Sequence, residues 1–262
     1  MSTALDPSSL ASPARTAGAR SGRFLRYKAD RWPVALISLV FVARLLLFAF
    51  ASAGIAVAAL VPLTIVGMFI APFNHHHQHL NTFRSAWLNR VYDVVLALQT
   101  AVGPYTWVLH HNLGHHRNYL RQPPQDSADE SHWTRRDGSQ MGRIEYTAHL
   151  VLHHQFDVVR VGREHPHILR RHLWMKLPLY TLLAFALWWN AVGALCVFVL
   201  PAFFTLVHTA WATYEHHAGN PTDSHMEAST NRLHPAYNWL TGNLGYCLLY
   251  TSPSPRASIA SR

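Results

Sequence analysis

The chain has 262 residues, of which 50 % are hydrophobic and only 13 % are charged, whereas soluble domains carry about 25 % charged residues. That deficit points to a protein in a bilayer rather than a soluble one, and the length suits one domain with a buried site. The two cysteines are too few for a disulfide framework or a resident iron–sulfur cluster.

The N-terminal third of the chain predicts an arm followed by two membrane crossings. Residues 1–33 are rich in Ser, Ala, Pro and Arg without an apolar period, which predicts a disordered basic arm. Residues 34–72 are almost wholly apolar, and a spanning helix needs about 20 such residues, so we expect two crossings with a turn near 52–54. Arg44 interrupts the first crossing, and should face other helices or reach toward the lipid headgroups.

A second apolar stretch, residues 177–211, predicts two more crossings with a turn near 190–193. Arginine and lysine are concentrated in residues 1–33 and 73–176, and neither expected turn carries any. By the positive-inside rule, both termini and the central segment are then cytoplasmic. The net charge of +9 is therefore a topology and headgroup signal, and nucleic-acid binding is not expected. The sequence predicts an all-α integral membrane protein with four transmembrane helices arranged as two hairpins.

Histidine is the outlier of the composition, with 20 residues that all lie between His75 and His234. A bias with such sharp limits implies a localised role, most simply metal binding. The dense clusters follow the ends of the second and fourth expected crossings or lie between the hairpins, so all of them fall on the cytoplasmic side.

Two of these clusters have spacings that suit metal ligands. The first reads NHHHQH, and on a helix His75 and His79 would share a face and bind one metal ion. The second reads HHNLGHH, in which His111 and His115 share a face. His116 is rotated by about 100° from its neighbour, so this cluster can address two metal ions.

The third cluster, Tyr214-Glu215-His216-His217, gains weight beside the other two. We expect Glu215 to hold one imidazole in a fixed tautomer. At least six histidines without a nearby cysteine favour iron over a closed structural zinc site, although imidazole also suits copper, nickel and zinc.

The remaining histidines of the central segment are interpreted as interfacial, and His208 within the fourth crossing as a functional candidate. The interfacial set is His149, His153, His154, His165, His167 and His172. Asp126, Asp129 and Glu130 follow the second cluster, where they are either partners of the imidazoles or part of a solvated loop.

The spacings His75-x-x-x-His79 and His111-x-x-x-His115-His116, each after an apolar segment, resemble those of the membrane fatty acid desaturase and hydroxylase family. The phrases WVLHHNLGHHRNYL and YNWLTGNLGY are similar to those of its bacterial members. The resemblance covers residues 34–246. It implies a multi-pass protein of a bacterial inner membrane, with a cytoplasmic helical cap that carries the histidine boxes.

The resemblance further implies two iron ions (Fe2+/Fe3+) held almost entirely by histidines, with no catalytic side chain beyond the metal centre. The ligands present in this chain would be His75, His79, His111, His115, His116, His216 and His217. O2 would be reduced at that centre, and a hydrogen would be removed from an unactivated methylene of a lipid acyl chain, as in fatty acid biosynthesis. Electrons would come from a separate ferredoxin, rubredoxin or cytochrome-type donor, which agrees with the low cysteine count.

The end of the chain departs from the family pattern. A His-x-x-His-His box is expected soon after an Asn-x-Gly-Tyr phrase, but residues 247–262 contain no histidine, and Cys247 stands where the first one should be. The decapeptide CLLYTSPSPR is what TGT CTC TTA TAC ACA TCT CCG AGC CCA CGA encodes, a string that resembles a transposase sequencing adapter. We expect residues 247–262 to be non-native, and this incomplete domain to be inactive, unlike the product of its parent gene.

Three functions stay open at this point. The first is desaturation of an acyl chain, and the second is hydroxylation of alkanes, carotenoids or lipids on the same scaffold, because both begin with the same hydrogen abstraction. The third is metal binding or transport without oxygen chemistry. That function predicts ligands along a path through the bilayer, but Arg44 and His208 are the only ionisable groups in the expected crossings.

Overall fold

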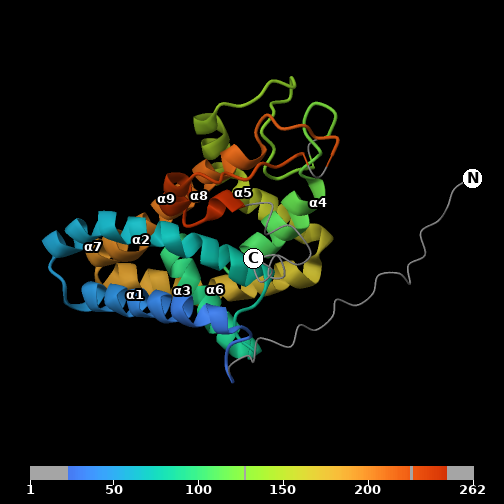
Figure 1. Cartoon of the computed structure of the whole chain (residues 1–262). Helices are drawn as coiled ribbons and strands as arrows, with labels where there is room; N and C mark the ends of the chain where they lie inside the picture. The colour runs from blue at the N-terminus through green and yellow to red at the C-terminus, as the bar shows by residue number, and fades with distance from the viewer. Residues whose placement is uncertain (1–22, 127, 225–226, 247–262) are drawn as a thin grey trace, which may run out of the picture.

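The computed structural model describes residues 23–126, 128–224 and 227–246 (Figure 1). Within these residues the regular elements are helices, and the only β pairings are two isolated bridges. The predicted all-α class is therefore confirmed. Residues 1–22, which make up most of the predicted arm, and the predicted foreign tail 247–262 lie outside the described residues.

The first apolar stretch forms helices α1 (Arg31–Phe50) and α2 (Ala53–His79). The chain reverses at Ala51 and Ser52, next to the turn predicted near residues 52–54. The apolar run was therefore sufficient to predict where α1 ends and α2 begins. Ser52 caps α2, because its hydroxyl oxygen accepts a hydrogen bond from the N–H of Ile55 at 3.4 Å.

Arg44 faces other helices, one of the two positions that the sequence left open. Its side chain is fully buried, and its two terminal nitrogens donate to the carbonyl oxygens of Val197 at 2.6 Å and Leu63 at 2.8 Å. The guanidinium therefore joins α1 to α2 and to Val197, which lies beyond the turn of the second apolar stretch. Both hydrogen-bonded nitrogens find partners away from water, as a charge in a membrane helix requires.

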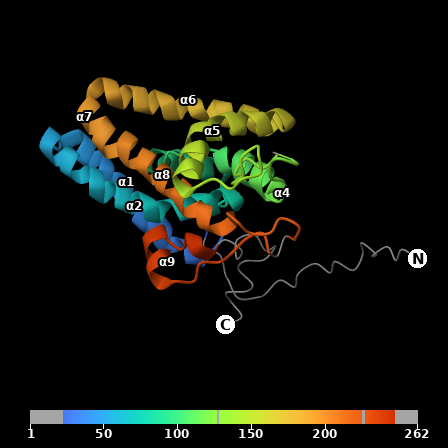
Figure 2. The ribbon, with the colours of Figure 1, turned by 90° about the horizontal axis from the view of Figure 1, so that it is seen from above.

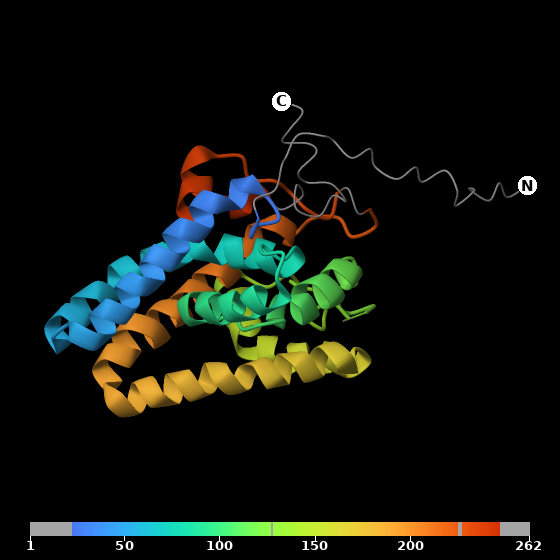
Figure 3. The same cartoon turned by 90° about the horizontal axis from the view of Figure 1, so that it is seen from below.

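The second apolar stretch is divided at Asn190, within the predicted turn (Figures 2 and 3). In chain order its elements are α6 (Pro166–Trp189), α7 (Ala191–Ala194), the π-helical turn η4 (Leu195–Val199) and α8 (Leu200–His217). The Asn190 amide accepts from the N–H of Gly193 at 2.9 Å and donates to the carbonyl oxygen of Phe48 at 3.2 Å. This amide ties the second turn to the end of α1, so both turns lie at one end of the molecule (Figure 1).

Three segments of the described chain are long and apolar enough to cross a bilayer: Lys28–Phe50, Ala53–His79 and Ala191–His217. Helix α6 is not among them. Its first half carries Arg170, Arg171 and Lys176, and a continuous apolar run begins only at Leu177. The prediction of four crossings is thus matched by three helices, and the fourth crossing stays a prediction.

The other described elements are shorter helices and one long helix, α5, around the ends of α2 and α8. They are α3 (Ala86–Thr100), the π-helix η3 (Val108–His115), α4 (His116–Asn118), α5 (Arg143–Glu164), α9 (Pro235–Thr241) and η5 (Leu244–Tyr246). A short 3-10 helix, η2 (Lys28–Asp30), precedes α1. Helix α4 lies at the end of the molecule opposite the two turns (Figures 1 and 2).

Helices α2 and α8 run side by side and in the same direction, because each follows one of the two turns. Their contact is close at Gly67, where an added Cβ would lie 2.2 Å from Oγ1 of Thr205 and 3.1 Å from the carbonyl oxygen of Gln99. Small residues allow membrane helices to approach in this way. The C-terminal ends of α2 and α8, which carry histidines, therefore emerge at the same end of the molecule.

Candidate metal centre

The end of α2 supplies the first pair of histidines. The Nε2 atoms of His75 and His79 are 3.1 Å apart, and a nitrogen of His111 completes a group whose members all lie within 4.8 Å of one another. Metal–imidazole bonds of about 2.0–2.1 Å leave the nitrogens of neighbouring ligands about 3 Å apart. The group therefore has dimensions that suit one metal ion, as the spacing of His75 and His79 predicted, with His111 as an added member.

The second box lies on a π-helix rather than on the α-helix that the sequence predicted. The N–H of His116 bonds to the carbonyl oxygen of His111, five residues back, and π-turns of this kind are frequent at functional sites. The rings of His111 and His115 are still stacked, with centroids 5.3 Å apart and planes 21° apart. The backbone at Gly114 passes close to Glu130, because an added Cβ would lie 2.3 Å from Oε2 and 2.6 Å from Cδ of that side chain.

His116 lies between the rings of His79 and His111 and the ring of His115. Its ring centroid is 4.2 Å from that of His111 and 5.4 Å from that of His79, and 5.6 Å from that of His115. The sequence predicted that the second box could address two metal ions, and His116 occupies the position between the two candidate sites.

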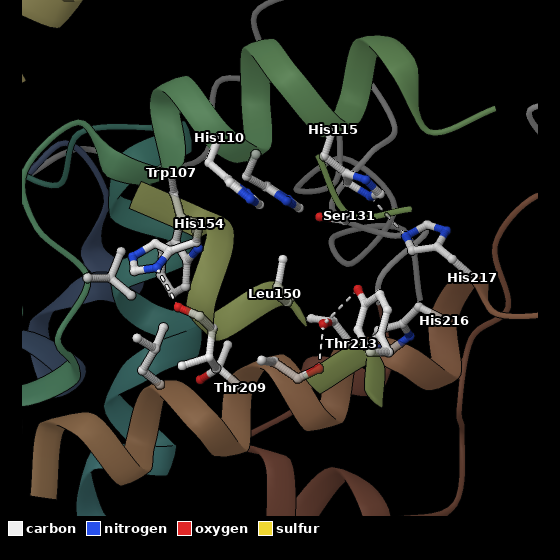
Figure 4. Close-up of a pocket in the computed structure, with 16 residues that line it drawn as sticks. Trp107, His110, His115, Ser131, Leu150, His154, Thr209, Thr213, His216 and His217 are labelled. Atoms are coloured by element: carbon white, nitrogen blue, oxygen red, sulfur yellow. Dashed lines mark hydrogen bonds between the residues drawn. The ribbon is translucent and has the colours of Figure 1, made fainter. Parts of the chain in front are cut away.

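The end of α8 supplies the partner of His115. The Nε2 atoms of His115 and His217 are 3.1 Å apart and point toward each other (Figure 4). The Nδ1 atom of His115 lies 2.9 Å from a carboxylate oxygen of Asp129, and Nδ1 of His217 lies 2.9 Å from the carbonyl oxygen of Ala228. Both of these oxygens can only accept, so in neutral rings both Nδ1 atoms carry the hydrogen and both Nε2 atoms are acceptors. Two acceptors that face each other in a buried space are the arrangement expected around a cation.

His216 presents its ring to the same space from the next position on α8. Its Nδ1 lies 3.3 Å from the carbonyl oxygen of Thr230, and its Nε2 is buried without a hydrogen-bond partner. Of the seven histidines predicted as ligands, the structure therefore brings five into two groups, with His116 between the groups and His216 lining the adjacent cavity.

A cavity of about 80 Å³ is lined by six histidines: His110, His111, His115, His154, His216 and His217. Its other walls come from the segment before η3, from α5 and from α8, including Trp107, Leu150, Thr209 and Thr213 (Figure 4). The cavity is therefore the space next to the imidazoles in which a small group could meet a bound metal.

The electrostatics of the second box favour neutral imidazoles. Burial, followed by repulsion from neighbouring histidines, lowers the pKa of His111 well below its usual value and that of His116 to about 3. Both rings are therefore neutral at pH 7, each with a free lone pair. The Nε2 atoms of both are buried without a hydrogen-bond partner, a state that a metal ion would relieve. The residues present thus fit a histidine-held metal centre.

Asp129 belongs to this centre and not to a solvated loop. It is fully buried, and its second carboxylate oxygen accepts from the amide of Gln122 at 2.9 Å. Glu130 is also buried and lies 3.3 Å from Arg160, whereas Asp126 is exposed. The sequence left open whether these three acids are partners of the imidazoles or part of a solvated loop. Only Asp129 contacts one of the predicted ligands, His115.

Two further expectations from the sequence were wrong. Glu215 does not contact an imidazole in the described interactions but forms ion pairs with Arg143 and with Arg232, the latter at 2.6 Å. His172 is not interfacial, because it is fully buried and its Nδ1 lies 2.8 Å from the carbonyl oxygen of Pro104.

The sequence analysis also missed His110. This residue is buried, burial lowers its pKa to about 3, and its Nε2 has no hydrogen-bond partner although the ring lines the cavity. The doubled histidine that opens the second box was the one available signal. Helical spacing gave no reason to choose His110, since only His111 matched the expected face.

These features define a helical membrane protein with a buried, histidine-lined candidate metal centre. The sequence profile of the fatty acid desaturase family matches residues 53–247, more than half of the chain. The chain therefore belongs to the fatty acid desaturase family, as the histidine boxes indicated, and this membership implies an oxidoreductase-type enzyme. Separate comparisons with curated proteins and with solved structures found no match.

Proposed function

We propose that this protein is an O2-dependent di-iron desaturase that introduces a double bond into a lipid acyl chain. The observation that carries the proposal is the pair of facing Nε2 atoms on His115 and His217, 3.1 Å apart, each fixed as an acceptor by the oxygen behind its ring. That arrangement lies beside a second histidine group in a chain of the desaturase family.

The histidines divide naturally between two ions. His75, His79 and His111 form one group, and His115 and His217 form the other. His116 lies between the groups, and His216 presents a buried, unpartnered Nε2 to the same cavity. When bound, the two irons would supply the reduction of O2 and the removal of hydrogen from an unactivated methylene.

The protein's own residues would prepare this centre. Asp129 and the carbonyl oxygen of Ala228 hold the rings of His115 and His217 in the tautomer that offers Nε2 to a metal. Trp133 stacks on His217 with centroids 6.0 Å apart and is itself buried, so it limits access of water to that ring. Electrons would come from a separate ferredoxin, rubredoxin or cytochrome-type protein.

The proposal also includes the orientation and the fourth crossing. The apolar half of α6, from Leu177 to Trp189, is supported as a crossing by its exposed Leu182, Phe185 and Trp188. Both termini and the histidines would then lie on the cytoplasmic side, as the distribution of arginine and lysine predicts. Labelling of single introduced cysteines from either side of sealed vesicles would contradict this orientation if positions near Ser52 reacted from the cytoplasmic face.

The test is to express the source gene, including whatever coding sequence follows Tyr246, and to measure metal content and lipid products by mass spectrometry. Reading that locus also tests the expectation that residues 247–262 are foreign. We expect iron in the purified protein and lipids that have lost two hydrogens, with both results abolished by His115→Ala. His167→Ala, on an exposed ring, is the matched control and should change neither.

The other outcomes identify the alternatives. Lipids that gain oxygen would overturn desaturation in favour of a hydroxylase on the same scaffold. Zinc or copper alone, with unchanged lipids, would overturn both and favour a membrane metal-binding protein.

A further inference from the structure

Three histidines outside the candidate metal centre lie ring against ring where a loop meets α5. His149 and His153 are one turn apart on α5, and their rings are stacked, with centroids 4.4 Å apart and planes 29° apart. His132, from the loop before α5, places its ring against that of His149, with centroids 4.7 Å apart. His149 and His153 were interpreted from the sequence as interfacial, and spacing gave no sign that His132 would join them.

Two of the three rings are held in one tautomer by backbone oxygens. Nδ1 of His132 lies 3.0 Å from the carbonyl oxygen of Asp129, and Nδ1 of His153 lies 2.9 Å from that of His149. Carbonyl oxygens only accept, so in the neutral rings Nδ1 carries the hydrogen and Nε2 keeps its lone pair. The carbonyl oxygen behind His217 in the candidate metal centre acts in the same way. Each of these rings therefore offers Nε2 to a metal ion.

The ring of His149 is neutral as well. Burial, followed by repulsion from His132 and His153, lowers the pKa of His149 below its usual value. Glu145 and Asp157 act in the opposite direction, because their carboxylates favour positive charge at this place. The surroundings of His149 thus disfavour a proton on the ring while they attract a cation.

Both carboxylates already have partners of their own. An oxygen of Glu145 accepts from Nε of Arg135 at 2.7 Å, and Asp157 is paired with Arg160 at 3.1 Å. The three imidazoles are therefore the available ligands. A tetrahedral ion held by three histidines keeps its fourth position for water.

An ion would have to turn these rings toward one point. The nitrogens of the group that contains His75 all lie within 4.8 Å of one another, whereas those of the three stacked rings are spread more widely. His153 is exposed, and His132 and His149 are only half-buried. Their side chains can therefore rotate without displacing packed core residues.

We propose that His132, His149 and His153 form a surface metal site that binds one Zn2+ ion or a divalent ion with the same preference for imidazole. Two histidines four residues apart on a helix share one face and bind zinc together, and a third imidazole completes a three-histidine site. Imidazole suits zinc, copper and nickel, and no thiolate is needed. The site is separate from the candidate metal centre, and it goes beyond the proposed function without depending on it.

The ion would tie the loop before α5 to that helix. His132 lies on the loop, three residues after Asp129, whereas the other two ligands lie on α5. The backbone of Asp129 accepts from His132, and its carboxylate accepts from His115. A metal ion at the surface would therefore brace the loop that carries the partner of His115.

The first test follows each ring separately. The full protein in detergent is treated with diethyl pyrocarbonate, which modifies free imidazoles, over a series of Zn2+ concentrations, and the modified peptides are mapped by mass spectrometry. We expect Zn2+ to slow the modification of His132, His149 and His153 together, while the exposed His167 reacts at an unchanged rate. Zinc at the candidate metal centre is not confused with this site, because its histidines are mapped individually.

Removing one ring should weaken the protection of the other two. His149→Ala should raise the Zn2+ concentration that protects His132 and His153 at least about tenfold, because groups that only orient a ligand already contribute about 10- to 100-fold in affinity. His167→Ala is the matched control and should change nothing, and the elution volume in detergent checks folding. Equal protection in His149→Ala, or modification of His132 that Zn2+ does not slow, would overturn the three-histidine site.

The second test measures the link between the loop and α5. Arg136 is exposed on the loop, so trypsin cleavage after it reports local opening of this segment. We expect Zn2+ to slow this cleavage in the unsubstituted protein but not in His132→Ala, whereas cleavage after the exposed Arg170 of α6 should be the same in both. No slowing, or equal slowing in His132→Ala, would overturn the link. Neither test uses iron or lipid products, so its result is independent of the proposed function.

Discussion

Replacing Asp129 by alanine removes the group that fixes the tautomer of His115. Burial opposes ionisation of this carboxyl, but attraction to His115 and the hydrogen bond from the N–H of Ser131 outweigh it and hold the pKa of Asp129 below its usual value. The carboxylate is therefore charged at pH 7 and accepts from Nδ1 of His115 at 2.9 Å. Without it, the hydrogen of His115 is free to move to Nε2, the atom that would bind a metal.

The expected loss follows from that geometry. Groups that orient metal-bound imidazoles contribute about 10- to 100-fold in metal affinity, which corresponds to about 1.4–2.8 kcal/mol. We therefore expect Asp129→Ala to release iron to a competing chelator at about 10- to 100-fold lower chelator concentration than the unsubstituted protein. Asp129→Asn keeps an amide oxygen that accepts a hydrogen bond, so its iron should be released at a chelator concentration between those of Asp129→Ala and the unsubstituted protein.

The assay measures bound iron by mass spectrometry over a series of chelator concentrations, with elution volume in detergent as the check on folding. Asp126→Ala is the matched control, because Asp126 is exposed and its partner Arg121 is 3.5 Å away at the surface. Equal retention of iron by folded Asp129→Ala and by the control would refute the role given to this carboxylate.

Further predictions concern stability, backbone geometry and pH. Arg44→Met should lower the thermal midpoint, because each buried carbonyl left without its donor costs about 1–3 kcal/mol; an unchanged midpoint would contradict this. Gly114→Ala should lower iron content, because the new Cβ would lie 2.3 Å from Oε2 of Glu130, and Glu130→Ala in the same chain should restore it if that clash is the cause. In metal-free protein, His110 and His116 have pKa values of about 3, below the value of about 6.5 in unfolded chains. Unfolded chains therefore bind more protons, and the thermal midpoint should be constant above about pH 6.5 and fall as the pH drops toward 3, whereas a midpoint that rose in that range would refute the assignment.

The sequence was most informative where a single local property decides the structure. An unbroken apolar run over residues 34–72 is long enough for two helices, and Ser52 is a good capping residue, so the break between α1 and α2 was predictable. The turn at Asn190 was predictable for the same reasons. Helix α6 was harder, because its polar first half and apolar second half form one continuous helix across the expected boundary at Leu177.

The details of the site depend on contacts between distant residues, which spacing does not contain. The second box forms a π-helix at Val108–His115, and Gly114 within it lies against Glu130, which is 16 residues further along the chain. Glu215 forms ion pairs with Arg143, which is 72 residues away in the sequence, and with Arg232, which lies in a loop. Neither pairing could be read from the spacing of the histidines. Spacing therefore identified most of the imidazoles that gather, but not which acids accompany them.

The contact of Gly67 with Thr205 has a consequence for the evolution of this centre. This contact sets the distance between helices α2 and α8. By the rise of an α-helix it lies about 12 Å before His75, whereas the histidines are at the C-terminal ends of the two helices. A larger side chain at Gly67 would push α2 and α8 apart and so move the imidazoles of α2 away from those of α8. A substitution at this helix contact can thus move the histidines of the candidate metal centre relative to one another, although it lies about two helical turns away from them.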